Sequence, residues 1–301
     1  MSRLATILCL ALASGHTAAA FSQPATSSAV PIIRGDWTAD TRATWRGDDG
    51  EARVQMNLRS TAGDNRWGFG VRPSELDGLP AAAMSGGATN VQFSWTREAG
   101  VFRFSGSFDA GRGAGTCTFT SSAAFVSGMA GLGYRSLSAD DVLRLALHDV
   151  THAFVRGLGQ AGYGSLLLDD LVRMKIHQVT PEGIGELAAL GYTHVPADDL
   201  IRLSIHGATP AEIGALQALG FRGMAVEDLI RFRIHKVTPE FVVSMREVGY
   251  VAVSEEQLIR LRIHNVDAQF VRDGRADGYA LQSPADAIEL AIHGPRLRRR
   301  R

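Results

Sequence analysis

Apolar and polar residues alternate along residues 37–120, which is the pattern of β-strands that bury one face. Turn sequences such as Asp48-Asp49-Gly50 and Gly111-Arg112-Gly113 separate runs that are close enough to pair as hairpins. We therefore expect a small antiparallel β meander of about six strands, a sandwich or a half-open barrel, with one helical turn within residues 80–87. The apolar members of the runs are Ala52, Val54, Met56 and Leu58; Trp67, Phe69 and Val71; Val91, Phe93 and Trp95; Phe102, Phe104 and Phe108; and Cys117 and Phe119.

From residue 122 onward the apolar residues recur at helical spacing instead. Phe241, Met245 and Val248 lie at i, i+4 and i+7, which puts them on one face of a helix of about three turns. Threonine and proline before this run are helix-start signals, and glycine followed by an aromatic residue is a helix-stop signal. A second helix, over residues 256–264, is expected after a short turn.

The two-helix unit returns six times at intervals of 29 residues. Helices this short cannot bury both apolar faces within one pair, so the copies must stack on one another. The sequence therefore predicts an antiparallel β domain over residues 36–121, followed by an all-α solenoid of about six repeats over residues 122–295. The repeated start, stop and aromatic positions are Ser122, Thr151, Thr180, Thr209, Thr238 and Asp267; Gly133, Gly162, Gly191, Gly220, Gly249 and Gly278; and Tyr134, Tyr163, Tyr192, Phe221, Tyr250 and Tyr279.

The two ends of the chain have their own patterns. Residues 1–20 combine Arg3, a short apolar run and three small residues at 18–20, which is typical of a secretory signal peptide. We therefore expect export to the periplasm or secretion, with residues 21–35 as a linker. Residues 296–301 form a basic tail, which is either a solvated end or a weak contact with an anionic surface. The charges of that contact would be Arg298, Arg299, Arg300 and Arg301.

Composition narrows the function classes. The chain is 45% apolar and 21% charged, which is ordinary for a globular protein. Its formal net charge is zero, which argues against a nucleic-acid partner because such proteins usually carry a basic excess on one face. No segment approaches the roughly 20 apolar residues of a transmembrane helix, so none is expected in the mature chain.

Cys117 and the tryptophans are the conspicuous residues of the predicted β domain. Cys9 falls in the predicted signal, so Cys117 would be a lone thiol, and it shares an apolar face with Phe119. A buried small hydrophobe is the interpretation that we favour over a reactive thiol. The four tryptophans could form a binding platform, but core packing is the interpretation that we favour. They are Trp37, Trp45, Trp67 and Trp95.

An arginine and a histidine four residues apart recur on one face of each second helix, which predicts two parallel ladders along the array. We favour a structural role, in which each imidazole bonds an open backbone group at a helix end and each guanidinium does the same or pairs with an acidic residue. A cationic strip for an acidic partner is the second interpretation. A metal array is the third and weakest, because one histidine per layer is too sparse. The ladders are Arg144, Arg173, Arg202, Arg231 and Arg260, and His148, His177, His206, His235, His264 and His293.

Positions that vary between copies are better candidates for specificity, because a changing surface on a constant frame is how repeat proteins recognise extended ligands. Two positions stand out, one directly after the histidine and one two residues before it. No metal or cofactor site is expected. The predicted binding residues are Lys175, Gln178, Ser204, Arg233, Lys236, Arg262 and Asn265.

The segments 199–207 (Asp-Leu-Ile-Arg-Leu-Ser-Ile-His-Gly) and 237–242 (Val-Thr-Pro-Glu-Phe-Val) resemble a repeat of uncharacterised bacterial envelope proteins. In some of these the repeat forms the extracytoplasmic tail of membrane metallopeptidases of the β-lactam-sensor type. The strand at residues 113–120, which leads into the repeats, is also similar to members of that group. The peptidase part has no counterpart here, because the chain lacks a His-Glu-x-x-His motif and membrane spans, so the resemblance implies no hydrolase activity.

These patterns together predict a non-catalytic binding or scaffolding module of the bacterial cell envelope, whose helical repeat surface holds a protein or peptide partner. The alternative is an accessory or regulatory subunit of an envelope peptidase or sensor, with a ligand sensed by the β domain. An enzyme is the weakest interpretation, because no nucleophile, base and orienting group occur at a recognisable spacing.

Overall fold

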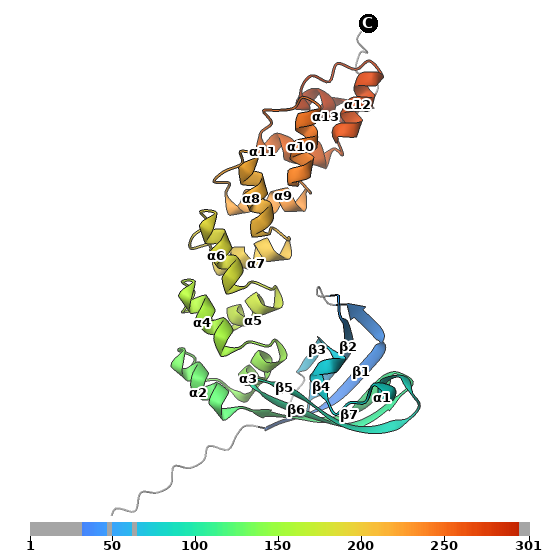
Figure 1. Ribbon diagram of the computed structural model, residues 1–301, viewed down its shortest axis with the longest axis vertical. Coiled ribbons are helices and arrows are strands. Elements are labelled where there is room, and N and C mark those ends of the chain that lie inside the picture. The colour runs from blue at the N-terminus through green and yellow to red at the C-terminus, as the bar shows by residue number, and fades with distance from the viewer. Residues whose placement is uncertain (1–31, 47–49, 62–64, 295–301) are drawn as a thin grey trace, which may run out of the picture.

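The computed structural model describes residues 32–46, 50–61 and 65–294, which form a curled antiparallel β-sheet followed by a column of short helices (Figure 1). The predicted fold class, a small β domain followed by an all-α solenoid of two-helix repeats, is confirmed. The predicted signal peptide, the predicted basic tail and residues 21–31 of the predicted linker lie outside the described residues.

The sheet consists of two antiparallel meanders. They are joined by pairing between the first and the last strand along the chain. Strand β1 pairs with β7, so that Gly35 faces Cys117 and Ala39 faces Gly113, and all neighbouring strands are antiparallel. This long-range pairing turns two hairpin stacks into one curled sheet of order β3-β2-β1-β7-β6-β5-β4. The strands are β1 (Ile32–Arg46), β2 (Ala52–Ser60), β3 (Arg66–Val71), β4 (Leu76–Asp77), β5 (Thr89–Arg97), β6 (Gly100–Asp109) and β7 (Arg112–Ser121).

The strands differ from the sequence prediction in two details. Strand β1 begins at Ile32, so the last residues of the predicted linker belong to the sheet. Strand β4 has only two residues, which is too short to produce an alternating pattern, and it follows a 3-10 turn at Pro73–Glu75. The expected helical turn is present as α1 (Ala81–Ser85).

An aromatic core fills the inner face of the sheet. The Trp37 ring lies edge-on to Phe93 with centroids 5.3 Å apart, and Phe102 lies 4.6 Å from Phe119. Trp37 and Trp95 are almost fully buried, so these two tryptophans pack the core and form no surface platform. Aromatic pairs at these distances add about 0.5–1.5 kcal/mol each beyond the burial of their area.

Cys117 is buried in the same core, as the alternation predicts. Burial, with a smaller contribution from the charge of Asp36, raises the pKa of its thiol from 9.0 to about 12. The reactive form of cysteine is the thiolate, so this raised pKa keeps the Cys117 thiol of the folded protein protonated and poorly reactive at neutral pH.

A thiol titration of a Cys9→Ser chain should therefore distinguish folded from unfolded protein. At pH 8 the folded chain holds about a thousandfold less thiolate than a thiol of unshifted pKa, and a disulfide reagent should label Cys117 rapidly only in denaturant. The folded state also keeps its proton where the unfolded state loses it, so stability should fall as pH rises from 9.0 toward about 12. Fast labelling of the native chain at pH 8 would contradict the buried-thiol interpretation.

Twelve helices between residues 123 and 293 form the array, and their starts follow the predicted signals. The hydroxyl of Thr180 accepts a hydrogen bond from the backbone N–H of Gly183 at 3.0 Å, and Thr238 does the same for Phe241 at 3.3 Å. The helices are α2 (Ala123–Gly131), α3 (Ala139–Leu147), α4 (His152–Gln160), α5 (Leu168–Ile176), α6 (Pro181–Ala189), α7 (Ala197–Ile205), α8 (Pro210–Ala218), α9 (Val226–Ile234), α10 (Pro239–Glu247), α11 (Glu255–Ile263), α12 (Ala268–Ala276) and α13 (Pro284–His293).

The glycine-aromatic stop signals also act as the sequence predicts. Gly249 has a φ of +91°, which glycine adopts at little cost. Its N–H donates to Arg246, and the N–H of Tyr250 donates to Met245 at 3.0 Å. These two bonds satisfy carbonyls that a helix end leaves open, as in a Schellman motif.

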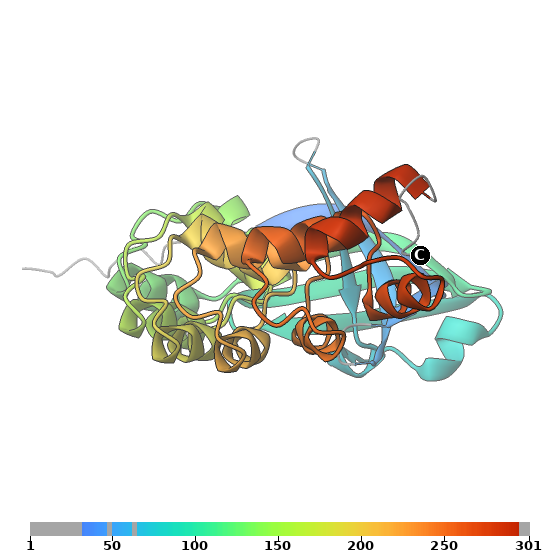
Figure 2. The same ribbon diagram turned by 90° about the horizontal axis from the view of Figure 1, so that it is seen from above.

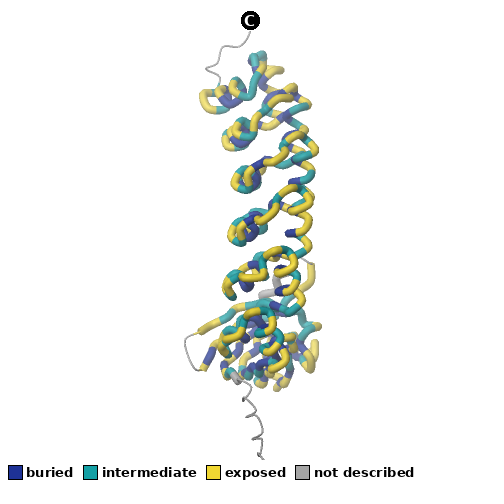
Figure 3. The backbone as a smooth tube through the Cα atoms, turned by 90° about the vertical axis from the view of Figure 1, so that its left-hand side faces the viewer, coloured by how far each residue is buried: buried dark blue, intermediate teal, exposed yellow. Residues whose placement is uncertain are grey.

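The helices stack in two rows, with even-numbered helices in one and odd-numbered helices in the other. Figure 2 shows the even-numbered row roughly end-on and the odd-numbered row from the side. In Figure 3 the array rises from the β domain as a column whose helices each carry buried and exposed residues. Each helix contacts the equivalent helices of the neighbouring copies, which is the packing of a solenoid.

The β domain closes the first end of this column. Helix α3 contacts β1, β6 and β7, and the N–H of Ser122 donates to Ala99 at 2.8 Å. Arg97, at the end of β5, lies 3.6 Å from Asp149, just beyond α3. The sheet therefore covers apolar surface of the first copy that would otherwise face solvent.

Candidate functional site

The arginine ladder is a chain of ion pairs that links consecutive copies. Each guanidinium reaches an acidic side chain in the first turn of the next odd-numbered helix, 25 residues later. Hydrogen bonding to this acid raises the pKa of Arg173, Arg202 and Arg231. The ladder is thus largely neutralised, which weakens the interpretation of a cationic strip. The pairs are Arg144–Asp169, Arg173–Asp198, Arg202–Glu227 and Arg231–Glu256, each at 2.7 Å.

The ion-pair chain ends where the sequence of the last copy departs from the repeat. Arg260 would find its acid at position 285, which is an alanine, and its own position in the last copy is taken by Glu289. Arg260 is exposed in the structure. It is the ladder arginine best placed to meet an external acid.

The histidine ladder marks the end of each odd-numbered helix. His148, His177, His206, His235 and His264 are the C-cap residues, whereas His293 is the last residue of α13. The hydrogen bonds that the structure shows at these five C-caps come from the histidine backbone, not from the ring. Burial, and then the charge of Arg144, lowers the pKa of His148, so this ring is neutral near pH 7.

Residues two positions before the histidine bind the histidine carbonyl of the preceding copy. Arg233 Nε donates to His206 at 3.1 Å, and Arg262 Nε donates to His235 at 3.3 Å. Ser204 donates in the same way to His177, whereas Lys175 lies 3.8 Å from Asp149. Four of the predicted binding residues thus have contacts inside the array, and their role in binding a partner stays a prediction.

The even-numbered row repeats this arrangement with other side chains. Gln217 Nε2 donates to Leu190 at 2.9 Å, and Arg275 Nη1 donates to Val248 at 2.7 Å. Arg246 donates to Leu219 between these two copies. The acceptors are again C-cap carbonyls, so both rows use a side chain from the next copy to satisfy an open helix end.

Residues directly after the histidine lie in the left-handed region of backbone space. Gln178, Lys236 and Asn265 have φ values of +57°, +56° and +54°, and glycine occupies the same position at 207 and 294. The variation at this position is therefore limited to residues that the turn accepts. Gln178, Lys236 and Asn265 are exposed, and their role in binding a partner stays a prediction.

A row of exposed isoleucines, which sequence reasoning missed, runs along the odd-numbered helices. One isoleucine directly precedes each histidine from the second copy on, and each is 49–54% exposed. The sequence does indicate this exposure. Position 176 lies three residues after Arg173 and seven after Asp169, which places it on the charged, exposed face of α5. The isoleucine row consists of Ile176, Ile205, Ile234, Ile263 and Ile292.

A gap opens between the helices of the third pair. It has a volume of about 370 Å³ and lies between the start of α6 and the end of α7. Val179, Ile184, Leu187, Leu200 and Leu203 supply apolar walls. Ser204 and Gly207 also line it, and in the sequence these two residues flank the pair of Ile205, a member of the isoleucine row, and His206.

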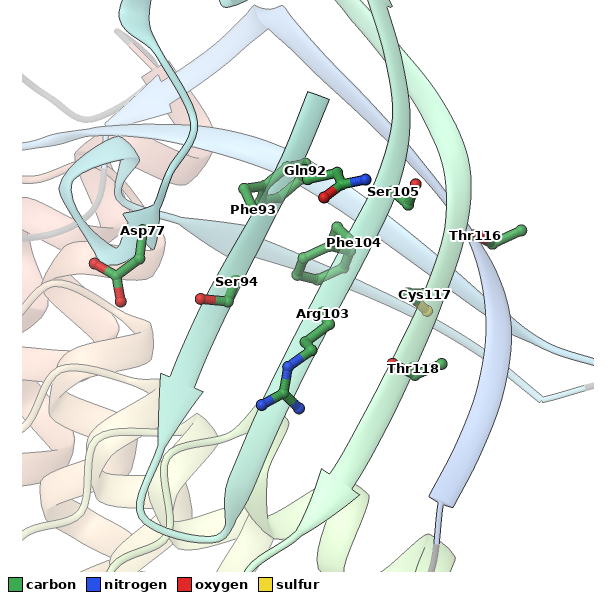
Figure 4. A pocket seen from close by; sticks show the side chains of 10 residues that line it. All are labelled: Asp77, Gln92, Phe93, Ser94, Arg103, Phe104, Ser105, Thr116, Cys117 and Thr118. Atoms are coloured by element: carbon green, nitrogen blue, oxygen red, sulfur yellow. The ribbon is translucent and has the colours of Figure 1, made fainter. Parts of the chain in front are cut away.

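The outer face of the sheet carries a shallow polar depression of about 390 Å³ (Figure 4). Two cross-strand rows form it, Gln92-Ser105-Thr116 and Ser94-Arg103-Thr118 on β5, β6 and β7. Among its lining residues are Asp77, Phe93, Phe104 and Cys117, but neither Trp67 nor Trp95. The depression is open to solvent, which is not the deep aromatic pocket that small-molecule sensing would favour.

His148 and His152 have the i, i+4 spacing of metal ligands on a helix, but both ring nitrogens of His152 contact other protein groups. His152 Nδ1 lies 2.5 Å from the Glu98 carboxylate and Nε2 lies 3.0 Å from the carbonyl oxygen of Phe125. Both ring nitrogens therefore join the β domain and the first helices. Within the described ranges, no cluster of three or more His, Cys, Asp or Glu side chains could hold a metal ion.

Neither a protein-family model nor a curated protein matches this sequence. The resemblance to envelope repeat proteins therefore rests on the repeat residues themselves. None of the helices in the described part of the chain has the length and hydrophobicity of a membrane span.

Proposed function

We propose that this chain is a non-catalytic binding or scaffolding module of the bacterial cell envelope, and that its odd-numbered helices hold an extended segment of a partner protein. The isoleucine row carries this proposal. Its five members recur at the repeat interval on one exposed face, whereas the residues on either side of the isoleucine-histidine pair vary. Exposed apolar rows of this kind are a feature of interaction surfaces.

The first copy supports the proposal that a partner covers the isoleucine row. Its equivalent residue, Leu147, is only 7% exposed, and it belongs to α3, the helix that contacts the sheet. The protein thus covers this face itself at the first copy and leaves it open at the next five. A partner that continued the cover along the column would bury the same position in each copy.

Specificity would come from the exposed residues beside the row. Gln178, Lys236 and Asn265 follow their isoleucines by two positions and differ in charge and hydrogen-bonding capacity. A constant apolar anchor with changing polar neighbours is suited to one extended partner sequence. Export to the periplasm or to the medium is part of the proposal, and the signal-like pattern at residues 1–20 supports it.

Photo-crosslinking and directed substitutions test this surface. A photoreactive phenylalanine analogue in place of Ile205, Ile234 or Ile263 should crosslink one common partner in envelope extracts. Ile234→Asp should then weaken binding of that purified partner by about tenfold or more, since a carboxylate would have to be desolvated in the interface. Val251→Asp is the matched control, because Val251 is 66% exposed but lies off the row. Unchanged affinity of the Ile234 variant would contradict the proposal.

A sensor subunit whose β domain binds a ligand is the second candidate function. The polar depression over β5, β6 and β7 is the observation in its favour. Its donors and acceptors, with Arg103 as the cation, suit a small polar or anionic ligand. The repeat surface remains the stronger candidate because it offers an apolar anchor in five consecutive copies.

A further inference from the structure

In the second to fifth helix pairs, the first turn of the even-numbered helix and the last turn of the odd-numbered helix that follows each place one residue at a common slot. The two positions are 21 residues apart, and their residues change together from copy to copy. Phenylalanine is the usual residue at the first position. The pairs are Phe125 and Ala146, Phe154 and Lys175, Gly183 and Ser204, Glu212 and Arg233, Phe241 and Arg262, and Phe270 and Ala291.

In the second, fourth and fifth copies the chain fills this slot with its own side chains. Phe154 and Phe241 are 8% and 7% exposed. The ammonium of Lys175 lies 5.1 Å from the Phe154 ring centre, and the Arg262 guanidinium lies 4.9 Å from that of Phe241. Such distances give cation–π attraction. In another copy, Glu212 and Arg233 replace the ring and cation with an ion pair of 2.6 Å.

The third pair is different because both of its positions hold small residues. Gly183 has no side chain, and the Ser204 hydroxyl is bonded to the His177 carbonyl. The gap of about 370 Å³ occupies this slot, and Gly183 and Ser204 both line it. Its apolar walls include Ile184, Leu200 and Leu203, which are buried residues of α6 and α7. An apolar cavity of roughly 150 Å³ is already enough to bind a benzene ring.

We propose that this gap binds a phenylalanine side chain of the partner, which enters where Phe154 and Phe241 supply a ring in their own copies. This inference rests on the proposed function and adds one specific anchor to it. Ser204 and Gly207 flank the Ile205-His206 pair in the sequence, so a segment lying on the isoleucine row at Ile205 passes beside the gap. Buried aromatic anchors of this kind contribute much of the affinity in protein interfaces.

Gly183→Phe tests the proposal by filling the slot from within. A Cβ atom at Gly183 would have its nearest neighbour, Thr180 Oγ1, at 3.3 Å, so a side chain can start there with a small adjustment. The probe is N-acetyl-phenylalaninamide, titrated into the full chain and followed by two-dimensional amide NMR. We expect saturable shifts confined to residues near the gap, weakened about tenfold or more in the variant. N-acetyl-alaninamide should give no saturable shifts.

Two controls make the result decisive. Gly185→Phe adds the same ring to the same helix at a position whose Cβ has no neighbour within 4 Å, and it should bind the probe as the unaltered chain does. Ser204→Arg fills the slot from the other helix and should also block the probe. Absence of binding to the unaltered chain, or equal binding by Gly183→Phe, would overturn the proposal.

The same variants separate this inference from the proposed function. Ile234→Asp lies outside the gap, so it should leave the probe titration unchanged while it weakens binding of the partner. If Ile234→Asp weakens binding of the partner and Gly183→Phe does not, the isoleucine row is the binding surface and the gap is no anchor. If neither variant affects the partner, the proposed function fails as well.

Discussion

Replacing Phe232 by alanine is expected to lower the free energy of unfolding by about 3 to 5 kcal/mol, the usual range for a buried phenylalanine. Phe232 lies in α9, near the middle of the array, and has 0% of its surface exposed. Its ring lies 5.8 Å from that of Phe221 in an edge-to-face arrangement. The substitution therefore removes buried contacts and leaves a cavity in the core of the array.

Denaturant unfolding followed by far-ultraviolet circular dichroism measures this effect, because the array contains most of the helical residues that the structure describes. In a solenoid each copy is stabilised by its neighbours, so the loss should also reduce the cooperativity of the helical transition. Val243→Ala is a suitable control, since Val243 is an exposed residue of α10 and its loss should cost little. A change below about 1 kcal/mol for Phe232→Ala would contradict the packing of this copy.

Gly115→Ala is expected to destabilise the β domain by about 3 kcal/mol, at the upper end of the cost of overpacking. Gly115 on β7 faces Gly106 on β6. A Cβ atom at Gly115 would lie 2.0 Å from the Ser105 oxygen and 2.6 Å from the Gly106 Cα atom, so the two strands would have to separate. The paired glycines thus allow β6 and β7 to approach closely where the sheet curls.

Tryptophan fluorescence can follow this unfolding selectively, since all four tryptophans occur between residues 37 and 95. Gly87→Ala is the matched control, because a Cβ atom there would meet nothing within 4 Å. The control should leave the fluorescence transition nearly unchanged. An equally small effect of Gly115→Ala would show that the strands are not packed as closely as the structure has them.

Much of the array could be predicted because its signals are local and repeated. Thr238 caps a helix and Gly249 ends one through short-range backbone chemistry, so sequence alone locates both. The six-fold recurrence of these signals also predicts the stacking. The pairing of β1 with β7 could not be predicted in the same way, because it depends on contacts between residues far apart in the chain.

The candidate site was harder to predict because it depends on which side of a helix faces a neighbour. Ser204 and Arg233 vary between copies, which suggested a surface role, yet their side chains reach carbonyls of the preceding copy. Ile234 is apolar and no role was predicted for it from the sequence, yet it is 51% exposed. Gly183 could have been noticed as the missing phenylalanine, but only the structure shows that nothing else fills its place.

The side-chain hydrogen bonds to C-cap carbonyls all run from a later copy to the copy before it, and this gives the array a modular length. Side chains of the third to sixth copies satisfy carbonyls of the copy before them, at a separation of 27 residues in both rows. Duplication or deletion of a whole unit of 29 codons would keep every such bond in register. An insertion or deletion within a helix would instead turn its contact residues away from the neighbouring copies, so changes in complete units conserve the array best.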